Sequence, residues 1–216
     1  MKKNQILIII ASAIIVTIFI ILFIFPGRQK NSGSELPTPT PAPPKLVEIE
    51  VKDRPNISLT PRSDGHELTL KISNISSLIN QIEYEITYLA TDDNLEIEKG
   101  ASGIIEAEEL ATGKSERKIL LGTESCTNGC KYKYDTGVRG GKLSLVFSLK
   151  NGQMSIFESP FILQSTADLK KAGGRLVWTE ENYTYTPKNK PSGTHFYIAH
   201  KNYLDSGYLV TSSGAL

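Results

Sequence analysis

The two cysteines of the chain are the residues whose type and spacing point most directly to chemistry. Cys126 and Cys130 enclose Thr127-Asn128-Gly129, three residues that suit a tight turn. The structural interpretation is a disulfide across this turn, with Asn128 or Gly129 at positive φ. A redox pair would favour C-x-x-C spacing at the start of a helix. A zinc site needs four ligands, and the sequence offers no second cysteine pair and no nearby histidine pair. We therefore expect a disulfide.

The three histidines, His66, His195 and His200, are the natural candidates for acid–base catalysis. Acyl transfer would also need a serine or cysteine nucleophile in a glycine-flanked turn, and the sequence shows no such pattern. Ser115-Glu116-Arg117-Lys118 matches the S-x-x-K of penicillin-recognising enzymes, but the Ser-Asp-Asn and Lys-Thr-Gly partners of that motif do not occur. A glycine-rich phosphate loop is missing from the sequence as well. We therefore expect no catalytic residues and no cofactor.

One turn of the chain is rich in oxygen ligands, which Ca²⁺ prefers. The residues concerned are Asp92, Asp93, Asn94 and Glu96. They lack the glycine and the spacing of an EF-hand loop, so they are at most a weak calcium site. Otherwise we expect no metal.

A second candidate site lies near the end of the chain, where aromatic and basic residues recur. It consists of Trp178, Tyr183, Tyr185, Lys188 and Lys190. Amphipathic rings beside lysines could form a contact surface for a glycan or for another protein of the cell envelope. The alternative is ordinary packing within strands and at sheet edges.

Charge is distributed unevenly along the chain. Residues 46–110 carry 14 acidic and 5 basic side chains, whereas residues 111–216 carry 8 acidic and 14 basic ones. Acidic and basic strands could pair across a sheet, or the two halves could form a dipolar surface that orients a partner. Since residues 46–216 are acidic overall, we do not expect nucleic acid as a partner.

An apolar segment near the N-terminus precedes all of these candidate residues. Ile6–Phe25 contains no charge in twenty residues, and at about 1.5 Å per residue such a helix spans ~30 Å, the hydrocarbon thickness of a bilayer. The alternative is a cleaved signal peptide, but only about five apolar residues precede Ala11-Ser12-Ala13, fewer than a signal peptide needs. We predict an uncleaved single-pass transmembrane anchor.

A linker follows the predicted anchor. Residues 26–45 include Leu36-Pro37-Thr38-Pro39-Thr40-Pro41-Ala42-Pro43-Pro44, in which proline excludes both helix and sheet and favours a polyproline-II spacer. Lys2 and Lys3 precede the anchor, and Arg28 and Lys30 follow it, so positive charge does not decide its orientation. The cysteines suit an oxidising compartment. We therefore predict residues 1–5 in the cytoplasm and the C-terminal domain outside the cell membrane.

From Leu46 onward the apolar residues recur with a period of two, which is typical of antiparallel strands with one solvated face. Ile82–Tyr88 and Leu143–Leu149 show this alternation most clearly. Turn sequences separate the strands, among them Gly140-Gly141 and Asn151-Gly152. The second should form a two-residue hairpin loop with both residues at positive φ. The pattern predicts an all-β fold, an antiparallel β-sandwich of seven to nine strands over residues 46–164.

Leu68 to Gly122 resembles the immunoglobulin-like and fibronectin-like modules that bacteria display outside the membrane. The resemblance lies in Ser73-Asn74-Ile75-Ser76 at the end of a strand, in the strand Ile82–Tyr88, and in Leu110-Ala111-Thr112-Gly113 ahead of Ile119–Leu121. It covers about a quarter of the chain and implies an immunoglobulin-like architecture. Modules of this kind serve adhesion, scaffolding and ligand capture alike.

The remaining residues, 165–216, should form a C-terminal β extension that either completes the same domain or stands apart from it. Ser165–Gly174 is expected to be a short helix or a loop. Taken together, these features predict a membrane-anchored surface protein that binds or scaffolds without catalysis. The alternative is an accessory to an envelope or wall enzyme, whose site would combine scattered residues, such as His195 or His200 beside an acid.

Overall fold

The structure is a computed structural model that describes residues 44–216, apart from 93–94, 128, 190–192, 206 and 215–216. The predicted anchor, Ile6–Phe25, and the linker up to residue 43 lie outside the described residues. Among the helices of the described part, none combines the length and the apolar character that crossing a bilayer requires.

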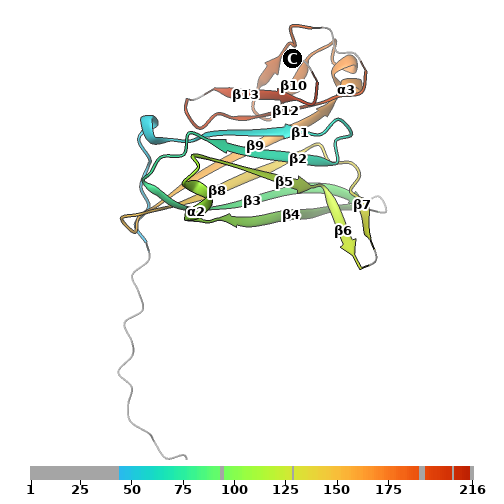
Figure 1. Cartoon of the computed structure of the whole chain (residues 1–216). Coiled ribbons are helices and arrows are strands. Elements are labelled where there is room, and N and C mark those ends of the chain that lie inside the picture. The colour runs from blue at the N-terminus through green and yellow to red at the C-terminus, as the bar shows by residue number, and fades with distance from the viewer. Residues whose placement is uncertain (1–43, 93–94, 128, 190–192, 206, 215–216) are drawn as a thin grey trace, which may run out of the picture. The chain divides into compact units, whose positions relative to one another are not determined.

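Antiparallel strands make up most of the described chain, which confirms the all-β prediction (Figure 1). Buried residues alternate with half-buried or exposed ones along β1, β2 and the middle of β8, as the period of two predicted. The elements are η1 (Val51–Asp53), β1 (Asn56–Pro61), β2 (Glu67–Ser73), β3 (Ile79–Asp92), β4 (Leu95–Ile105), α2 (Ala107–Leu110), β5 (Lys114–Leu120), β6 (Gly122–Cys126), β7 (Cys130–Tyr134), β8 (Gly140–Leu149), β9 (Met154–Ser165), α3 (Thr166–Lys171), β10 (Leu176–Trp178), β11 (Tyr183–Tyr185), β12 (Phe196–Lys201) and β13 (Tyr208–Ser212).

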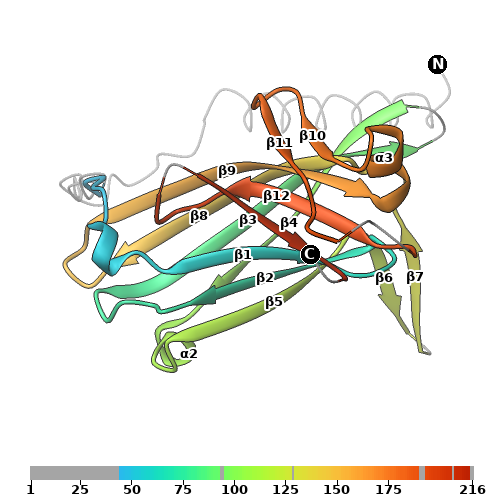
Figure 2. The same ribbon diagram turned by 90° about the horizontal axis from the view of Figure 1, so that it is seen from above.

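Two of the sheets share one hydrophobic core. One sheet has six strands in the order β13-β12-β9-β8-β3-β4, and the other has three in the order β1-β2-β5. Leu59 and Leu70 from the three-stranded sheet belong to the same buried cluster as Ile86, Leu145 and Phe161 from the six-stranded sheet. In Figure 2, β1, β2 and β5 form a group to one side of β9, β8 and β3. We call the face of the six-stranded sheet that points away from this shared core its outer face.

The C-terminal residues complete the six-stranded sheet, because β12 pairs with β9 and β13 pairs with β12. A second buried cluster covers this end of the sheet and includes Leu169 of α3, Leu176 of β10 and Tyr197 of β12. Helix α3 begins with a capping box, in which Ser165 and Asp168 each accept a hydrogen bond from the other's backbone N–H. The described C-terminal residues therefore belong to the same compact unit as the strands before them.

The hairpin between β8 and β9 differs from the prediction. Its loop has three residues, because the Leu149 N–H donates to the Gln153 carbonyl, and only Gly152, at +79°, has a positive φ among them. The Gly152 N–H donates to the Leu149 carbonyl at 2.9 Å, so residues 149–152 form a turn that ends at the left-handed glycine. The Asn151 side chain stabilises this geometry by accepting a hydrogen bond from the Gln153 N–H at 3.0 Å. A left-handed Asn151 is therefore not needed, and that part of the prediction is wrong.

Candidate functional site

A groove of about 1010 Å³ lies on the outer face of the six-stranded sheet. Its floor includes Thr87 of β3 and the pair Gly140-Gly141 at the start of β8. The sequence pattern suggested a turn at these glycines, but they belong to the strand. A Cβ atom on either one would collide with a carbonyl oxygen of a neighbouring strand, that of Phe161 or that of Thr87. The floor therefore requires glycine.

One wall of the groove is built by β10, which is hydrogen-bonded to β9 through the side chain of Gln164. The Gln164 side chain donates from Nε2 to the Val177 carbonyl at 2.8 Å and accepts from the Val177 N–H at 3.3 Å. These bonds take the place of strand pairing between β9 and β10. Trp178 follows Val177 in the wall and is 5% exposed, because its ring lies in the second buried cluster. The wall is thus fixed by both polar and apolar contacts.

Charged side chains line the groove from several strands. Glu96 and Glu98 of β4 and Glu180 after β10 contribute acids, and Arg139 and Lys142 contribute bases. Lys142 also pairs with Glu158 at 2.6 Å. Since both donors and acceptors point into an open groove, it suits a polar ligand that hydrogen-bonds on several sides.

Asp168 of α3 adds a carboxylate whose charge is stabilised locally. Burial raises its pKa, but hydrogen bonds from the Ser165 side chain and backbone, together with the charges of Lys171 and Arg139, outweigh this effect. The net result is a pKa below the ordinary value, so Asp168 is an anion at neutral pH.

The predicted contact surface is only partly at the surface. Trp178 is buried, Tyr183 and Tyr185 are half-buried against the second cluster, and Lys188 is exposed. Lys190 lies outside the described residues. Burial raises the pKa of Tyr183, so its phenol stays neutral. The ring of Trp178 is therefore not exposed enough for a ligand to stack on it, although Trp178 still lines the groove.

The predicted calcium residues lie at the turn between β3 and β4. Asp92 ends β3 and pairs loosely with Lys133 at 3.9 Å, and Glu96 reaches the groove from β4. Asp93 and Asn94 lie outside the described residues, so the calcium site remains a prediction. The structure thus brings Glu96 and Trp178, from two separately predicted sites, to one groove.

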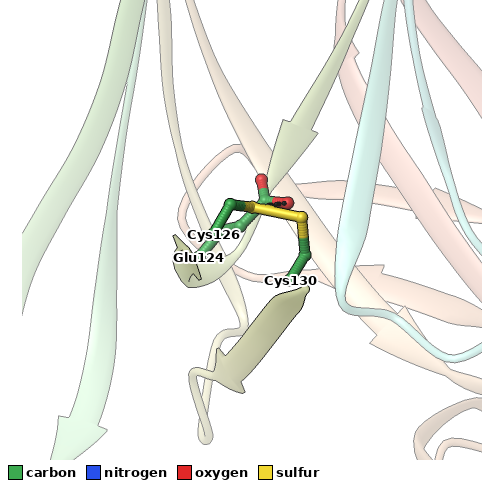
Figure 3. Close-up of side chains that lie close together, drawn as sticks. All are labelled: Glu124, Cys126 and Cys130. Atoms are coloured by element: carbon green, nitrogen blue, oxygen red, sulfur yellow. Dashed lines mark hydrogen bonds between the residues drawn. A yellow bond between two sulfur atoms is a disulfide. The ribbon is translucent and has the colours of Figure 1, made fainter. Parts of the chain in front are cut away.

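The two cysteines close a second feature, the hairpin of β6 and β7. Their sulfur atoms lie at disulfide distance, and their Cα atoms are 4.1 Å apart in directly paired positions (Figure 3). Gly129, at φ +93°, is the left-handed residue that the turn was expected to need. Nearly every residue of the two strands is exposed, and the hairpin projects beyond the sheets (Figure 1).

The base of this hairpin is anchored by a buried carboxylate that the sequence analysis missed. Asp135 accepts hydrogen bonds from the Tyr88 hydroxyl at 2.9 Å and from the Lys99 ammonium. Burial, and then this hydrogen bond, raises the pKa of Tyr88 above its ordinary range. On the other side, Tyr134 stacks on His66 with ring centroids 4.3 Å apart. No local pattern signals these contacts, because they join strands distant in sequence.

Of the three histidines, His66 lies beside the Asp64 carboxylate, which accepts a hydrogen bond from the His66 backbone N–H at 3.0 Å. His200 is fully buried, where Nε2 accepts a hydrogen bond from the Leu59 N–H at 3.3 Å and Nδ1 faces the Lys201 carbonyl at 2.8 Å. Burial lowers its pKa, which keeps it neutral. His195 lies before β12 and is half-buried.

The match to S-x-x-K is explained by local packing. Ser115 is buried and donates to Glu109, whose carboxylate also binds Arg117 at 2.7 Å. Lys118 is exposed on the same strand, and residues three apart on a strand point to opposite faces. Ser115 and Lys118 therefore cannot act on one substrate. Ser115 instead donates a hydrogen bond to Glu109, the acidic partner of Arg117.

Comparisons with known proteins leave the chain without an assigned family. No protein-family model matches it, and no curated protein matches it. Among solved structures, red sea bream transglutaminase is similar over 76% of this chain and 31% of that one, with 10% identity and a TM-score of 0.22. The similarity is too low to carry any argument about this chain.

Proposed function

We propose that the chain is a single-pass protein of the cell membrane that presents a non-enzymatic binding module outside the cell. Residues 6–25 would anchor it and residues 26–45 would act as a spacer. The two sheets with a common core support a β-sandwich, in line with the resemblance to immunoglobulin-like modules. The surface-exposed cysteine pair is consistent with an oxidising location.

The observation that carries this proposal is the groove on the outer face. It is open and lined by carboxylates, basic groups and hydroxyl-bearing residues. Such a surface suits an extended, hydroxyl-rich ligand, because each hydroxyl can both donate and accept. We therefore favour a glycan of the cell envelope over an envelope protein as the partner.

The alternative function, an accessory to an envelope enzyme, receives less support from the geometry. It would require a histidine beside an acid in a cleft. His200 instead contacts the backbone of Leu59 and Lys201 in the core, where a substrate has no access.

The test is direct binding of envelope oligosaccharides to the full-length protein in detergent, measured by calorimetry. We expect Arg139→Ala and Glu98→Ala in the groove to weaken binding about tenfold each, which corresponds to roughly 1.4 kcal/mol. Lys118→Ala on the opposite sheet is the matched control and should leave binding unchanged. Binding that is insensitive to both groove variants contradicts the proposal. Capture of an envelope protein without glycan binding contradicts the ligand class.

A further inference from the structure

We propose that the β6–β7 hairpin, when its cysteines are reduced, binds one zinc-class cation through Cys126, Cys130 and Glu124. One ligand atom from each side chain lies within 4.8 Å of the others. In the described part of the chain this is the one group of three such residues with converging ligand atoms. The site is separate from the groove and does not depend on the proposed function.

The hairpin register brings the three ligands together. Cys126 and Cys130 are directly paired across the strands, and Glu124 precedes Cys126 by two residues. Residues two apart on a strand point to the same face, so the carboxylate lies beside the sulfur atoms. Its Oε1 is 3.1 Å from Cys126 Sγ. Figure 3 shows the carboxylate beside the two sulfur atoms.

A neighbouring residue orients the carboxylate. Tyr132 lies opposite Glu124 in the register, and its hydroxyl donates a hydrogen bond to that carboxylate, which raises the pKa of the phenol. The Tyr132 ring is in turn nearly parallel to that of Tyr134, with centroids 6.1 Å apart, and Tyr134 stacks on His66. Hydrogen bonds of this kind commonly fix the ligands of metal sites.

The donor set fits Zn²⁺ once the sulfurs are thiolates. Zinc takes thiolate sulfur at ~2.3 Å and carboxylate oxygen at ~2.0–2.2 Å in a tetrahedron, and here water would take the fourth position. A disulfide offers no thiolate. A dithiol reductant must therefore first pass two electrons and two protons to the sulfurs and become a disulfide itself. The cation then displaces both protons from the thiols. The turn would thus be closed either by a disulfide or by a metal ion.

The experiment uses full-length protein in detergent, reduced with a dithiol that is then removed without oxygen. Titration with Co²⁺ should produce sulfur-to-cobalt charge-transfer absorption at one equivalent per chain, and competition with Zn²⁺ gives the zinc affinity. Oxidised protein should give no such band. We expect Glu124→Gln to weaken zinc binding about tenfold or more. Tyr132→Phe should weaken it less, because Tyr132 only orients the carboxylate, whereas Glu124 binds the metal directly. Glu116→Gln, an exposed carboxylate on β5, is the matched control and should have no effect.

Three results would overturn the proposal. One is a reduced protein that binds zinc no more tightly than the Cys126→Ser/Cys130→Ser double variant. Another is an affinity that Glu124→Gln leaves unchanged. The third is one metal ion per two chains with no dependence on Glu124, which would mean that four thiolates from two copies form the site. Because all three ligands are exposed, the variants should fold, and a thermal midpoint equal to that of the reduced wild type verifies this.

Discussion

The Nε2 atom of His200 accepts a hydrogen bond from the backbone N–H of Leu59, and this contact joins the two sheets. Leu59 is in β1 of the three-stranded sheet, and His200 is in β12 of the six-stranded sheet. The Leu59 carbonyl accepts a second bond from the Thr211 hydroxyl of β13. The N–H and the carbonyl of Leu59 are therefore both hydrogen-bonded to side chains of the six-stranded sheet. At this residue, side-chain bonds thus replace backbone pairing between β1 and the six-stranded sheet.

This contact predicts a loss of stability in mild acid. Burial lowers the pKa of His200 in the folded protein below the ordinary value of 6.5. The unfolded chain therefore binds a proton more readily, and the stabilisation that is present above about pH 6.5 is lost as the pH falls below it. Urea unfolding between pH 7 and pH 5 should show this slope in the wild type and a smaller one in His200→Gln. Thr211→Val is the control, because it removes the other side-chain bond to Leu59 but no titrating group, and it should keep the wild-type slope. A slope in His200→Gln equal to that of the wild type contradicts the prediction.

The anchor of the hairpin predicts that Asp135→Asn loosens β6 and β7. The change removes the charge that holds Lys99 and weakens the bond to Tyr88, and the side chain of Asp135 is only 4% exposed. We expect a loss of about 2 kcal/mol, within the usual cost of an unsatisfied buried group. Hydrogen exchange of the hairpin amides should accelerate.

Asp92→Asn is the control for this experiment, since Asp92 pairs with Lys133 of the same hairpin while both side chains are exposed. Exposed pairs contribute little, so its effect should stay within about 0.5 kcal/mol. Equal effects of the two variants would contradict the assigned role of Asp135.

The ion pair of Glu109 and Arg117 predicts a second pH dependence, in stronger acid. Hydrogen bonds from Arg117 and Ser115 lower the pKa of Glu109 to about 2, against an ordinary value of 4.5. The stabilisation is therefore complete above about pH 4.5 and is lost as the pH falls toward 2. Both side chains are partly exposed, so Glu109→Gln should cost only about 1 kcal/mol at pH 7.

Urea unfolding of wild type and Glu109→Gln at pH 7, 4 and 3 checks this prediction, and their difference should shrink with each step. Glu116→Gln is the control, because Glu116 pairs with Lys71 at 3.4 Å between exposed side chains. A difference between Glu109→Gln and wild type that stays constant down to pH 3 would refute the assigned pKa.

The sequence predicted those parts of the fold that depend on alternation. Ile82–Tyr88 lies within β3 and Leu143–Leu149 within β8, because each strand buries most of the residues on one face. Strand β4 was not predicted, since its inward residues are mostly half-buried and the alternation is faint. Strands β6 and β7 are exposed on both faces, so burial does not alternate along them.

The candidate sites were predictable only where neighbours in sequence form them. The cysteine pair could be recognised because it closes one turn, but the role of Glu124 depends on the hairpin register. The groove joins Thr87 of β3, Arg139 just before β8 and Trp178 of β10, which are distant in sequence, and no local pattern links them. The acidic strands β3 and β4 pair with each other, so opposite charge did not determine which strands are neighbours.

The disulfide predicts a small and local effect on stability. A ring that closes over Thr127-Asn128-Gly129 restrains few conformations of the unfolded chain, which corresponds to about 2 kcal/mol. Protein isolated under thiol-blocking conditions should contain the bond between Cys126 and Cys130, as peptide mass spectrometry would show. Reduction should accelerate exchange of the β6 and β7 amides and leave the core strands protected. Free thiols in native material would contradict the disulfide and remove one argument for an outside location.

The predicted topology can be tested on intact cells. If residues 6–25 cross the membrane with the N-terminus inside, the linker and the domain are exposed outside. Protease added to intact cells or spheroplasts should then cleave the proline-rich linker or the loops of the domain and leave a small membrane-bound fragment. A cytoplasmic protein probed in the same sample is the control and should remain intact until lysis. A domain that stays protected until the cells are lysed would place it inside, and both the anchor orientation and a surface-binding role would then be wrong.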